Sequence, residues 1–548
     1  MKELVTRRSF IRTLAVAAAC IPATVGICAP SQARQSGIRF EIDFPETVRQ
    51  EAVTGRMFVM LSRKGDPEPR FQVGRTGVPF FGIDVESLAP GRPAVIDDQV
   101  LGYPVESLRE IPAGEYFVQA LCNVYTRFER ADGKTVWMHQ DQWEGQNWRR
   151  SPGNIYSEVK KLQLDPNRNE TIRLELTRVI PPVAVPPDTK YVKRIKIQSA
   201  LLTRFWGRPM YLGAVVLLPE GYETHPNVYY PTVYSQGHFS LNPPFGFNEM
   251  NEFSQAWRGP DFPRFIAVTL QHPCPYFDDS YAVNSANCGP YGDAIHSELI
   301  PEIEKSFRCI RAPFARVLTG GSTGGWISVA LQVWYPDFYG GCYAFAPDPV
   351  DFRNVEGINI YEDTNAFYKI HEWYRVPTPN TRVPQTGETL LTSEQRNRFE
   401  LVNGTRGRSG EQLDIWSAVF GPVGDDGYFK PLFDKRTGAI DPAVAEYWRE
   451  HYDIRHYLER NWKTVGPKLV GKLHIFCGDM DNFFLNIGVR HLEAFLESTR
   501  EPYYAGSFTY GAMGGHGWRP MTTAQLLQLM AVHVLKNTPP GQPKDWRY

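Results

Sequence analysis

The segment Gly320-Gly321-Ser322-Thr323-Gly324 constrains the fold of this chain more than any other. An apolar run at residues 315–319 precedes it, and a helix-like stretch at residues 326–335 follows it. This order predicts a strand, a sharp turn and a helix, with Ser322 at the turn. A side chain on so tight a turn tolerates only small neighbours, which explains the glycines two positions away on either side. The pattern also occurs in ordinary glycine-rich turns, so residues further along the chain must decide whether Ser322 is reactive.

A serine hydroxyl becomes a useful nucleophile when a histidine takes its proton and a carboxylate orients that histidine. Residues 473–478 are predicted to form a buried strand, and Asp479 and Asp481 follow at once. This is the carboxyl end of the strand, where open α/β sheets place their chemistry. Asp481 is our choice for the acid. Asp479 is the alternative, because periodicity does not separate the two.

Three histidines follow Asp481 in the chain. His491 and His533 lie in helical patterns and are expected at the surface or in packing. His516 lies in the loop Gly514-Gly515-His516-Gly517-Trp518, after a strand-like run at residues 503–510. Glycines on both sides allow this loop to approach a serine closely. His516 is therefore the predicted base.

Acyl transfer also requires hydrogen-bond donors for the developing oxyanion. The backbone N–H of Thr323, directly after the serine, is one candidate. Residues 228–234 are predicted to form an early strand, and residues 235–239 form the loop after it. Gly237 allows the backbone of this loop to come close. The backbone N–H of His238 is therefore the second candidate.

Three blocks of the chain resemble the putative-esterase (esterase D-like) family of α/β-hydrolases: residues 298–304, 316–326 and 335–341. That family includes feruloyl and acetylxylan esterases, siderophore esterases and mycolyltransferases. The resemblance extends over about residues 190–548, and the serine block and the Gly-Gly-His-Gly-Trp loop carry most of its specificity. It implies an α/β-hydrolase fold with Ser322 as nucleophile, Asp481 as acid and His516 as base.

Two positions depart from the family pattern. Thr323 stands where the family usually has methionine, and Gln236-Gly237-His238 stands where it usually reads His-Gly. Both changes keep the backbone donors. They therefore bear on the substrate rather than on the chemistry.

The rest of the chain divides by pattern. Short alternating runs with turn signals between them recur over residues 37–180, which is typical of an all-β sandwich. The proline-rich residues 181–189 are predicted to form a stiff linker. Residues 190–548 alternate strand and helix patterns, which predicts an α/β domain with a mostly parallel sheet and helices on both faces. The long gap between the serine and the acid predicts an insertion at about residues 352–465.

Some aromatic and polar residues are candidates for contact with a substrate. The long loop at residues 272–291 leaves the carboxyl end of a predicted strand, so Tyr281 and Asn284 within it are assigned to the cleft. Trp326, in the helix after the serine, is assigned there as well.

The β-rich region contributes Trp137, Trp143 and Trp148. These side chains offer either a stacking platform for carbohydrate or packing against the α/β domain. Packing is the favoured interpretation, since no motif of a carbohydrate-binding module is visible.

Residues 1–33 resemble a twin-arginine export signal, with Arg7 and Arg8 ahead of a weakly apolar stretch. That stretch is too short to span a bilayer, which takes ~20 apolar residues. We therefore expect a periplasmic or secreted protein with no integral membrane segment after signal removal. Such a compartment permits disulfides, and Cys274 and Cys288, which bracket one loop, are the expected pair.

Composition excludes other classes of function. The formal net charge of −1 lacks the basic excess of a nucleic-acid binder. No cysteine and histidine spacing suits a zinc site, and neither a metal nor a cofactor is predicted. The sequence thus predicts an exported serine hydrolase of small or polysaccharide esters, with acyl or feruloyl esters of sugars as candidates. The alternatives are a siderophore esterase or acyltransferase of the same fold, and a catalytically dead scaffold that binds carbohydrate. The oligomeric state stays open.

Overall fold

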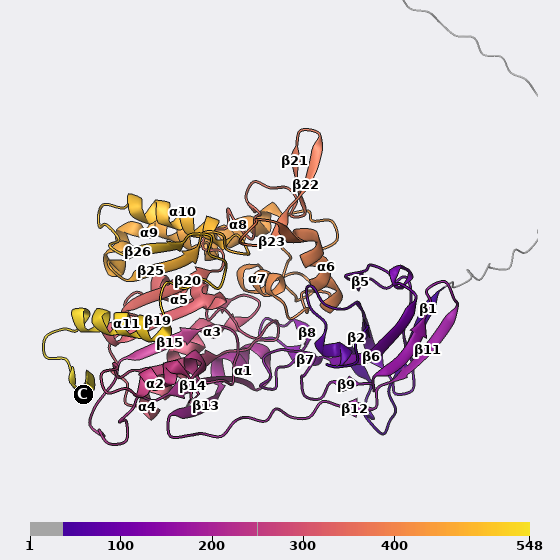
Figure 1. Ribbon diagram of the computed structural model, residues 1–548, viewed down its shortest axis with the longest axis horizontal. Helices are drawn as coiled ribbons and strands as arrows, with labels where there is room; N and C mark the ends of the chain where they lie inside the picture. The colour runs from indigo at the N-terminus through magenta and orange to yellow at the C-terminus, as the bar shows by residue number, and fades with distance from the viewer. Residues whose placement is uncertain (1–36, 249, 548) are drawn as a thin grey trace, which may run out of the picture. The chain divides into compact units, whose positions relative to one another are not determined.

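The computed structural model describes residues 37–248 and 250–547 (Figure 1). The predicted export signal at residues 1–33 lies outside the described residues. In the part that is described, no helix is both long and apolar enough to cross a bilayer. Residues 181–189 are almost wholly exposed and form no helix or strand. The domain boundaries drawn from the sequence stay predictions.

One large sheet organises the α/β part of the chain. Its strands are β13 (Val192–Ser199), β14 (Met210–Leu217), β15 (Thr232–Gln236), β16 (Ile266–Gln271), β19 (Arg316–Ser322), β20 (Gly341–Pro347), β25 (Leu473–Gly478) and β26 (Ser507–Gly511). They lie in the order β13-β14-β16-β15-β19-β20-β25-β26. The run from β16 to β26 is parallel throughout, and β14 is antiparallel to both of its neighbours. The predicted mostly parallel sheet is confirmed.

Helices cover both faces of this sheet. The chain passes from β15 to β16 through α2 (Glu252–Arg258), and from β19 to β20 through α5 (Thr323–Trp334) in the opposite direction along the sheet. Crossovers between parallel strands are right-handed, so these two helices lie on opposite faces. The last helix, α11 (Thr523–Asn537), contacts α2, whereas α9 (Ile454–Leu469) contacts α5 and α10 (Leu485–Ser498). The predicted two-sided cover is therefore confirmed.

The N-terminal β-rich region, drawn in indigo to purple in Figure 1, contains two larger sheets. One has the order β11-β1-β4, and the other is centred on β6, β2 and β3. Side chains of both sheets share one apolar core, to which β1 contributes Phe40 and Ile42, and β2 contributes Val59 and Leu61. The strands are β1 (Ile38–Asp43), β2 (Val53–Ser62), β3 (Phe80–Leu88), β4 (Ala94–Ile96), β5 (Gly102–Tyr103), β6 (Gly114–Val124), β9 (Ile155–Tyr156), β10 (Lys160–Leu164), β11 (Glu170–Glu175) and β12 (Arg178–Val179).

The insertion after β20 packs against this β-rich region. Phe399 and Val402 of α6 (Ser393–Asn403) share a core with Phe58 of β2. Arg56 is buried, and its Nε donates to the Val402 carbonyl over 2.8 Å. The other elements of the insertion are β21 (Tyr368–His371), β22 (Tyr374–Pro377), β23 (Pro379–Arg382), β24 (Thr389–Thr392), α7 (Gln412–Phe420) and α8 (Pro442–Tyr452).

The tryptophans of the β-rich region serve this packing. Trp148 stacks on Phe58 with 4.3 Å between ring centroids, and its Nε1 donates to Asn403 over 3.0 Å. Trp143 is buried and meets Phe239 of the α/β part edge to face. These two side chains do not form an exposed stacking platform. The packing interpretation favoured from the sequence is the one that the structure supports.

The expected disulfide is wrong. Cys274 and Cys288 are free, buried thiols, as are the other cysteines among the described residues. The two lie next to each other, and burial together with a hydrogen bond from Cys288 raises the pKa of Cys274 well above its ordinary value. Both therefore stay as packed thiols within the core rather than as a cross-link.

Candidate active site

Ser322 lies at the sharp turn between β19 and α5. Its backbone has φ 57° and ψ −123°, in a region that L-residues rarely occupy and that costs about 1–3 kcal/mol. The flanking glycines are required for space. A Cβ added at Gly324 would lie 2.1 Å from the Gln236 carbonyl oxygen, and one at Gly320 would lie 2.4 Å from the carbonyl oxygen of Gly324. The strand, turn and helix that the sequence predicts are therefore present with the strain and crowding that expose a serine.

His516 is held by the acid that we preferred from the sequence. The Asp481 carboxylate faces the imidazole, with 2.7 Å between Oδ2 and Nδ1. The other oxygen of this buried carboxylate accepts the backbone N–H groups of Phe483 and Leu485 over 2.9 and 3.3 Å. The His516 backbone N–H in turn donates to Asn482 over 2.8 Å. Asp481 therefore has one fixed oxygen to offer the histidine, and Asp479 has no such contact with it.

The electrostatic surroundings favour a protonated His516. Burial alone would lower the pKa of its imidazole, but the hydrogen bond and charge of Asp481, and then the charge of Asp348, outweigh burial. The pKa of His516 is consequently raised above its ordinary value. The raised pKa makes the neutral form of His516 a stronger base toward the serine proton.

Asp348, which the sequence analysis did not single out, occupies the centre of the site. It follows β20 directly and is buried. Its carboxylate accepts hydrogen bonds from Tyr281 Oη over 2.6 Å, from Thr323 Oγ1 over 3.0 Å and from Ser322 Oγ over 3.2 Å. Burial raises the pKa of Asp348, against the lowering effect of these hydrogen bonds and of the charges of His516 and His238.

Asp348 also shows how Ser322 and His516 are related in space. Within the described part of the chain, the Ser322 hydroxyl is hydrogen-bonded to Asp348 and not to His516. The charge of the same carboxylate acts on His516. Asp348 thus acts on the serine through a hydrogen bond and on the histidine through its charge. The signal that could have found it is Pro347-Asp348-Pro349 at the carboxyl end of a strand.

The loop predicted to carry the second oxyanion donor lies against the turn, because the backbone of Gly324 contacts Gln236 and Gly237. The His238 side chain points into an acidic pair, with Nδ1 at 3.0 Å from Asp278 and 3.3 Å from Asp279. Burial would lower the pKa of His238, but these two carboxylates raise it well above its ordinary value. The three side chains could also hold a cation. As they stand, His238 Nδ1 is hydrogen-bonded to Asp278, and Asp279 Oδ2 is close to the same nitrogen without a hydrogen-bond partner of its own.

The residues assigned to the cleft have different positions. Tyr281 is fully buried beside Ser322, where its hydroxyl donates to Asp348. Trp326 is fully buried behind Tyr281, with 5.3 Å between the two rings, and its Nε1 donates to the Pro349 carbonyl. Asn284, in β17 (Asn284–Ser285), accepts from the backbone N–H of Asp293 instead. Tyr281 and Trp326 therefore support the site from beneath.

The insertion supplies a further residue that the sequence analysis missed. Gln412, at the start of α7, donates through Nε2 to Asp348 over 3.0 Å and to Thr323 Oγ1 over 3.2 Å. It also contacts the Tyr281 hydroxyl. No spacing rule links residue 412 to the elbow, since several helices and strands of the insertion lie between them. The insertion thus contributes a side chain to the candidate active site through Gln412.

A family model matches the part of the chain that contains Ser322, but not the part that contains Asp481 and His516. The model of the family described as putative esterase matches residues 209–375, which include β14, β15, β19 and β20. This match confirms the resemblance seen in the sequence, and the fold is of the α/β-hydrolase type. The protein is a carboxylic ester hydrolase. No curated protein matches the chain.

Solved structures are similar only at low identity. A ferulic acid esterase is 15% identical, covers 63% of this chain and 99% of its own, and superposes with a TM-score of 0.35. The fluorophosphonate-binding serine hydrolase F of Staphylococcus aureus is 14% identical, with coverages of 63% and 98% and a TM-score of 0.34. The S-formylglutathione hydrolase of the same organism is 13% identical, with coverages of 63% and 100% and a TM-score of 0.32. Likenesses at this level identify neither the substrate nor the mechanism of this chain.

Proposed function

We propose that the protein is a serine esterase in which Ser322, His516 and Asp481 act as a catalytic triad. The proposal is supported by a strained serine at the strand–helix turn and by a histidine whose Nδ1 is 2.7 Å from a buried carboxylate, with Asp348 acting on both residues. Each of the three residues lies at the carboxyl end of a strand of the parallel sheet or in the loop that follows it. That is the edge at which sheets of this kind carry out chemistry.

The reaction has two halves. Ser322 Oγ attacks the ester carbonyl carbon while His516 takes the hydroxyl proton through Nε2, and Asp481 stabilises the imidazolium. His516 then delivers this proton to the departing alkoxide, which leaves an acyl-enzyme. Water repeats the sequence, with His516 as the base, and releases the acid. The backbone N–H groups of Thr323 and His238 bind the oxyanion, each worth about 3–4 kcal/mol in comparable sites.

The hydrogen bond between Ser322 and Asp348 defines a resting state. In this state the nucleophile donates its proton to a carboxylate whose pKa burial has raised. Rotation of the hydroxyl toward His516 is the step that makes the serine reactive. Asp348 then faces the imidazolium as a second negative charge and stabilises it together with Asp481.

The proposal is tested with 4-nitrophenyl acetate and methyl ferulate as substrates and with Ser322→Ala and His516→Ala as variants. Each substitution is expected to lower kcat by about 10⁴-fold or more, because the triad acts as one unit. A fluorophosphonate probe should label the wild type and not Ser322→Ala. Equal turnover by the wild type and both variants would rule out the triad. Absence of labelling would point to the inactive scaffold that was the alternative from the sequence.

We further propose that the protein is exported by the twin-arginine route and that its N-terminal region is a β-sandwich. The Arg7-Arg8 pair and the short apolar stretch after it support export. The core that the two N-terminal sheets share supports a sandwich. Cell fractionation of the wild type and of a variant carrying Arg7→Lys and Arg8→Lys tests export. Retention of both forms in the cytoplasm would contradict it.

A further inference from the structure

A pocket of about 430 Å³ lies where the N-terminal β-rich region meets the insertion. Its charged lining residues are Arg75, Arg149, Arg150 and Glu411. The remaining lining residues are neutral: Phe71, Val73, Gly74, Asn147 and Phe399. Three positive charges thus face one negative charge across a small volume.

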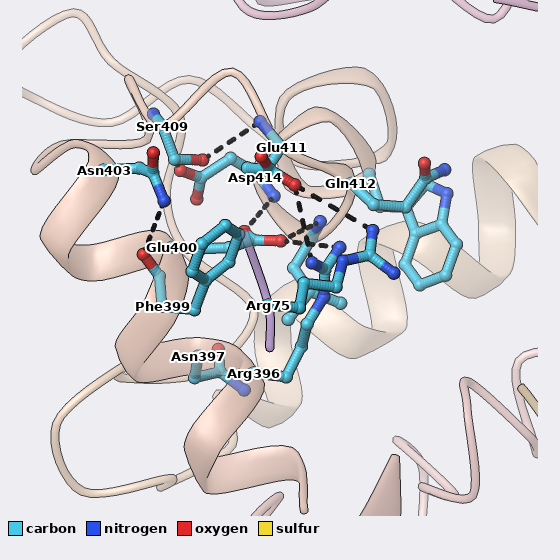
Figure 2. Close-up of polar contacts among 12 residues, drawn as sticks. Arg75, Arg396, Asn397, Phe399, Glu400, Asn403, Ser409, Glu411, Gln412 and Asp414 are labelled. Atoms are coloured by element: carbon cyan, nitrogen blue, oxygen red, sulfur yellow. Dashed lines mark hydrogen bonds and ion pairs between the residues drawn. The ribbon is translucent and has the colours of Figure 1, made fainter. Parts of the chain in front are cut away.

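Glu411 neutralises only part of the positive charge of this pocket. Its carboxylate lies 3.9 Å from Arg75 and also 3.5 Å from Arg396, and the two arginines lie side by side (Figure 2). Glu400, 3.1 Å from Arg396, is shared in turn with Lys435 at 2.7 Å. Glu400 and Glu411 are therefore already ion-paired with Arg396 and Lys435.

Arg149 is held in place without a counter-ion. Its guanidinium carbon lies 4.8 Å from the centre of the Trp148 ring, which is itself fixed by its stacking on Phe58. Among the residues that the structure describes, the Arg149 guanidinium has no hydrogen bond and no ion pair. Burial, opposed by Glu411 and reinforced by Arg150, lowers its pKa. Desolvated, unpaired guanidinium groups bind carboxylates and other oxyanions in bidentate fashion.

The pocket lies beside the candidate active site. Arg75 is 6.0 Å from the centre of the Phe483 ring, and the Phe483 ring is 4.9 Å from that of His516. Glu411 in the pocket wall is followed directly by Gln412, whose side chain contacts Asp348 and Thr323. These contacts connect the pocket wall to His516 and to Asp348, and an ester bound at Ser322 needs a second arm that extends from there to the arginines.

We propose that this pocket is an anion subsite and that the enzyme prefers esters carrying a carboxylate at a distance from the scissile bond. Arg149 and Arg75 pair with the carboxylate, and Arg150 at the exposed edge attracts it. The subsite rests on the proposed serine esterase function, because it is defined relative to Ser322. It adds a substrate class that the catalytic residues themselves do not select.

The test compares matched pairs of esters. On the acyl side, 4-nitrophenyl monoesters of succinic, adipic and suberic acid are compared with their methyl-capped neutral counterparts. On the alcohol side, 4-butanoyloxybenzoate, which is anionic, is compared with its neutral counterpart, methyl 4-butanoyloxybenzoate. In at least one pair the wild type is expected to show kcat/KM higher for the anionic ester by about tenfold or more at low salt. About 0.5 M salt should reduce the ratio by screening.

Arg149→Gln and Arg75→Gln are each expected to reduce this ratio to near one, and Arg149→Lys to retain part of it. Arg150 is exposed, so Arg150→Gln is the variant to use if the other two substitutions impair folding. It should partly lower the ratio of kcat/KM for the anionic ester to that for the neutral ester. The matched control is Arg168→Gln, an exposed arginine in the turn between β10 and β11, which should leave the ratio unchanged.

Two outcomes would overturn the inference. One is hydrolysis of the neutral esters without an anionic preference in any pair. The other is a preference that survives in Arg149→Gln, Arg75→Gln and Arg150→Gln alike. Failure of the wild type to hydrolyse any ester through Ser322 is a different result, and it would remove the proposed function together with the subsite.

Discussion

Two carboxylates act on His516 from different positions in the site. Asp481 holds its Nδ1, and the charge of Asp348 acts on it from beside Ser322. Both raise the pKa of the imidazole, so both stabilise the imidazolium that forms during acyl transfer. At the scale of single residues, the strength of the base is therefore set by two side chains from different strands.

The pH dependence of kcat/KM follows from these charges. The base must be neutral to accept the serine proton, and the raised pKa keeps it protonated to a higher pH, so activity is lost as pH falls through that pKa. For the wild type we expect an acid limb with a midpoint above 6.5. Asp348→Asn removes one negative charge and should move the midpoint to lower pH, with a fall in kcat of about tenfold.

Asp337→Asn, a substitution at an exposed position, is the control for this pH profile. It should leave the midpoint in place. An unchanged or higher midpoint in Asp348→Asn would show that the carboxylate does not act on His516.

The choice between the two acids after β25 is tested with a matched pair of variants. Asp481→Asn keeps the shape of the side chain but removes the charge that fixes the tautomer of His516, so kcat should fall by about 10⁴-fold. Asp479→Asn removes a carboxylate that has no contact with the histidine and should keep kcat within a few-fold. Steady-state kinetics on 4-nitrophenyl acetate measures both. Comparable losses in the two variants would count against Asp481 as the acid.

At the scale of elements, the turn between β19 and α5 is shaped by its contact with the loop after β15. A Cβ at Gly324 would overlap the Gln236 carbonyl, whereas a Cβ at Gly237 would meet nothing within 4 Å. The sequence argument that Gly237 is needed for close approach is therefore not supported by the packing, and Gly324 is the residue with that requirement.

Gly324→Ala should consequently destabilise the fold by about 1–3 kcal/mol, since the helix and the loop must move apart to admit the methyl group. It should also lower kcat, because the loop that carries the His238 N–H is displaced. Gly237→Ala is the matched control and should leave the melting temperature unchanged. Thermal unfolding monitored by circular dichroism distinguishes the two, and equal stability of both variants would refute the steric argument.

The sequence allows the regular elements to be predicted well, because their signals are local. The elbow and the strand at residues 473–478 have the apolar runs and glycines that their geometry requires, and the structure has them at or within a few residues of those positions. The loop of His516 was predicted from its glycines, and it follows β26 as expected.

Other parts of the site could not be predicted, since their positions depend on long-range packing. Gln412 comes from an insertion, and Arg75 comes from a separate β-rich region. Neither has a neighbour in sequence that belongs to the triad. Asp348 lies between these two cases. Its position directly after a parallel strand is a local signal from which it could have been predicted. The Cys274–Cys288 bridge failed because bracketing a loop does not determine whether a bond forms.

At the scale of the whole molecule, the β-rich region and the α/β part share apolar cores. Phe128 of β7 (Thr126–Glu129) and Val136 of β8 (Thr135–Met138) belong to the main α/β core. Phe399 of the insertion is covered by residues of the β-rich region. The β-rich region has an apolar core of its own, but the α/β core includes residues of β7 and β8, and the insertion relies on the β-rich region for its cover.

We therefore expect that residues 190–548 alone do not fold stably. Removal of residues 37–180 exposes the apolar face of α6 and also Trp206, which packs against Phe128. Each buried aromatic side chain that becomes exposed costs about 1.5–3 kcal/mol. The measurement is cooperative thermal unfolding and size-exclusion chromatography of the truncated chain. A chain lacking only residues 1–36 is the control and should unfold cooperatively. A monomeric, cooperative and active 190–548 fragment would contradict the expectation.

The anion subsite is lined by chain segments more than three hundred residues apart, such as those of Arg75 and Glu411, and none of its lining residues belongs to the triad. Mutations at the pocket can thus retune which molecules the enzyme accepts and leave bond cleavage itself intact. Natural selection or protein engineering can therefore change the substrate specificity at this pocket without replacing a catalytic residue.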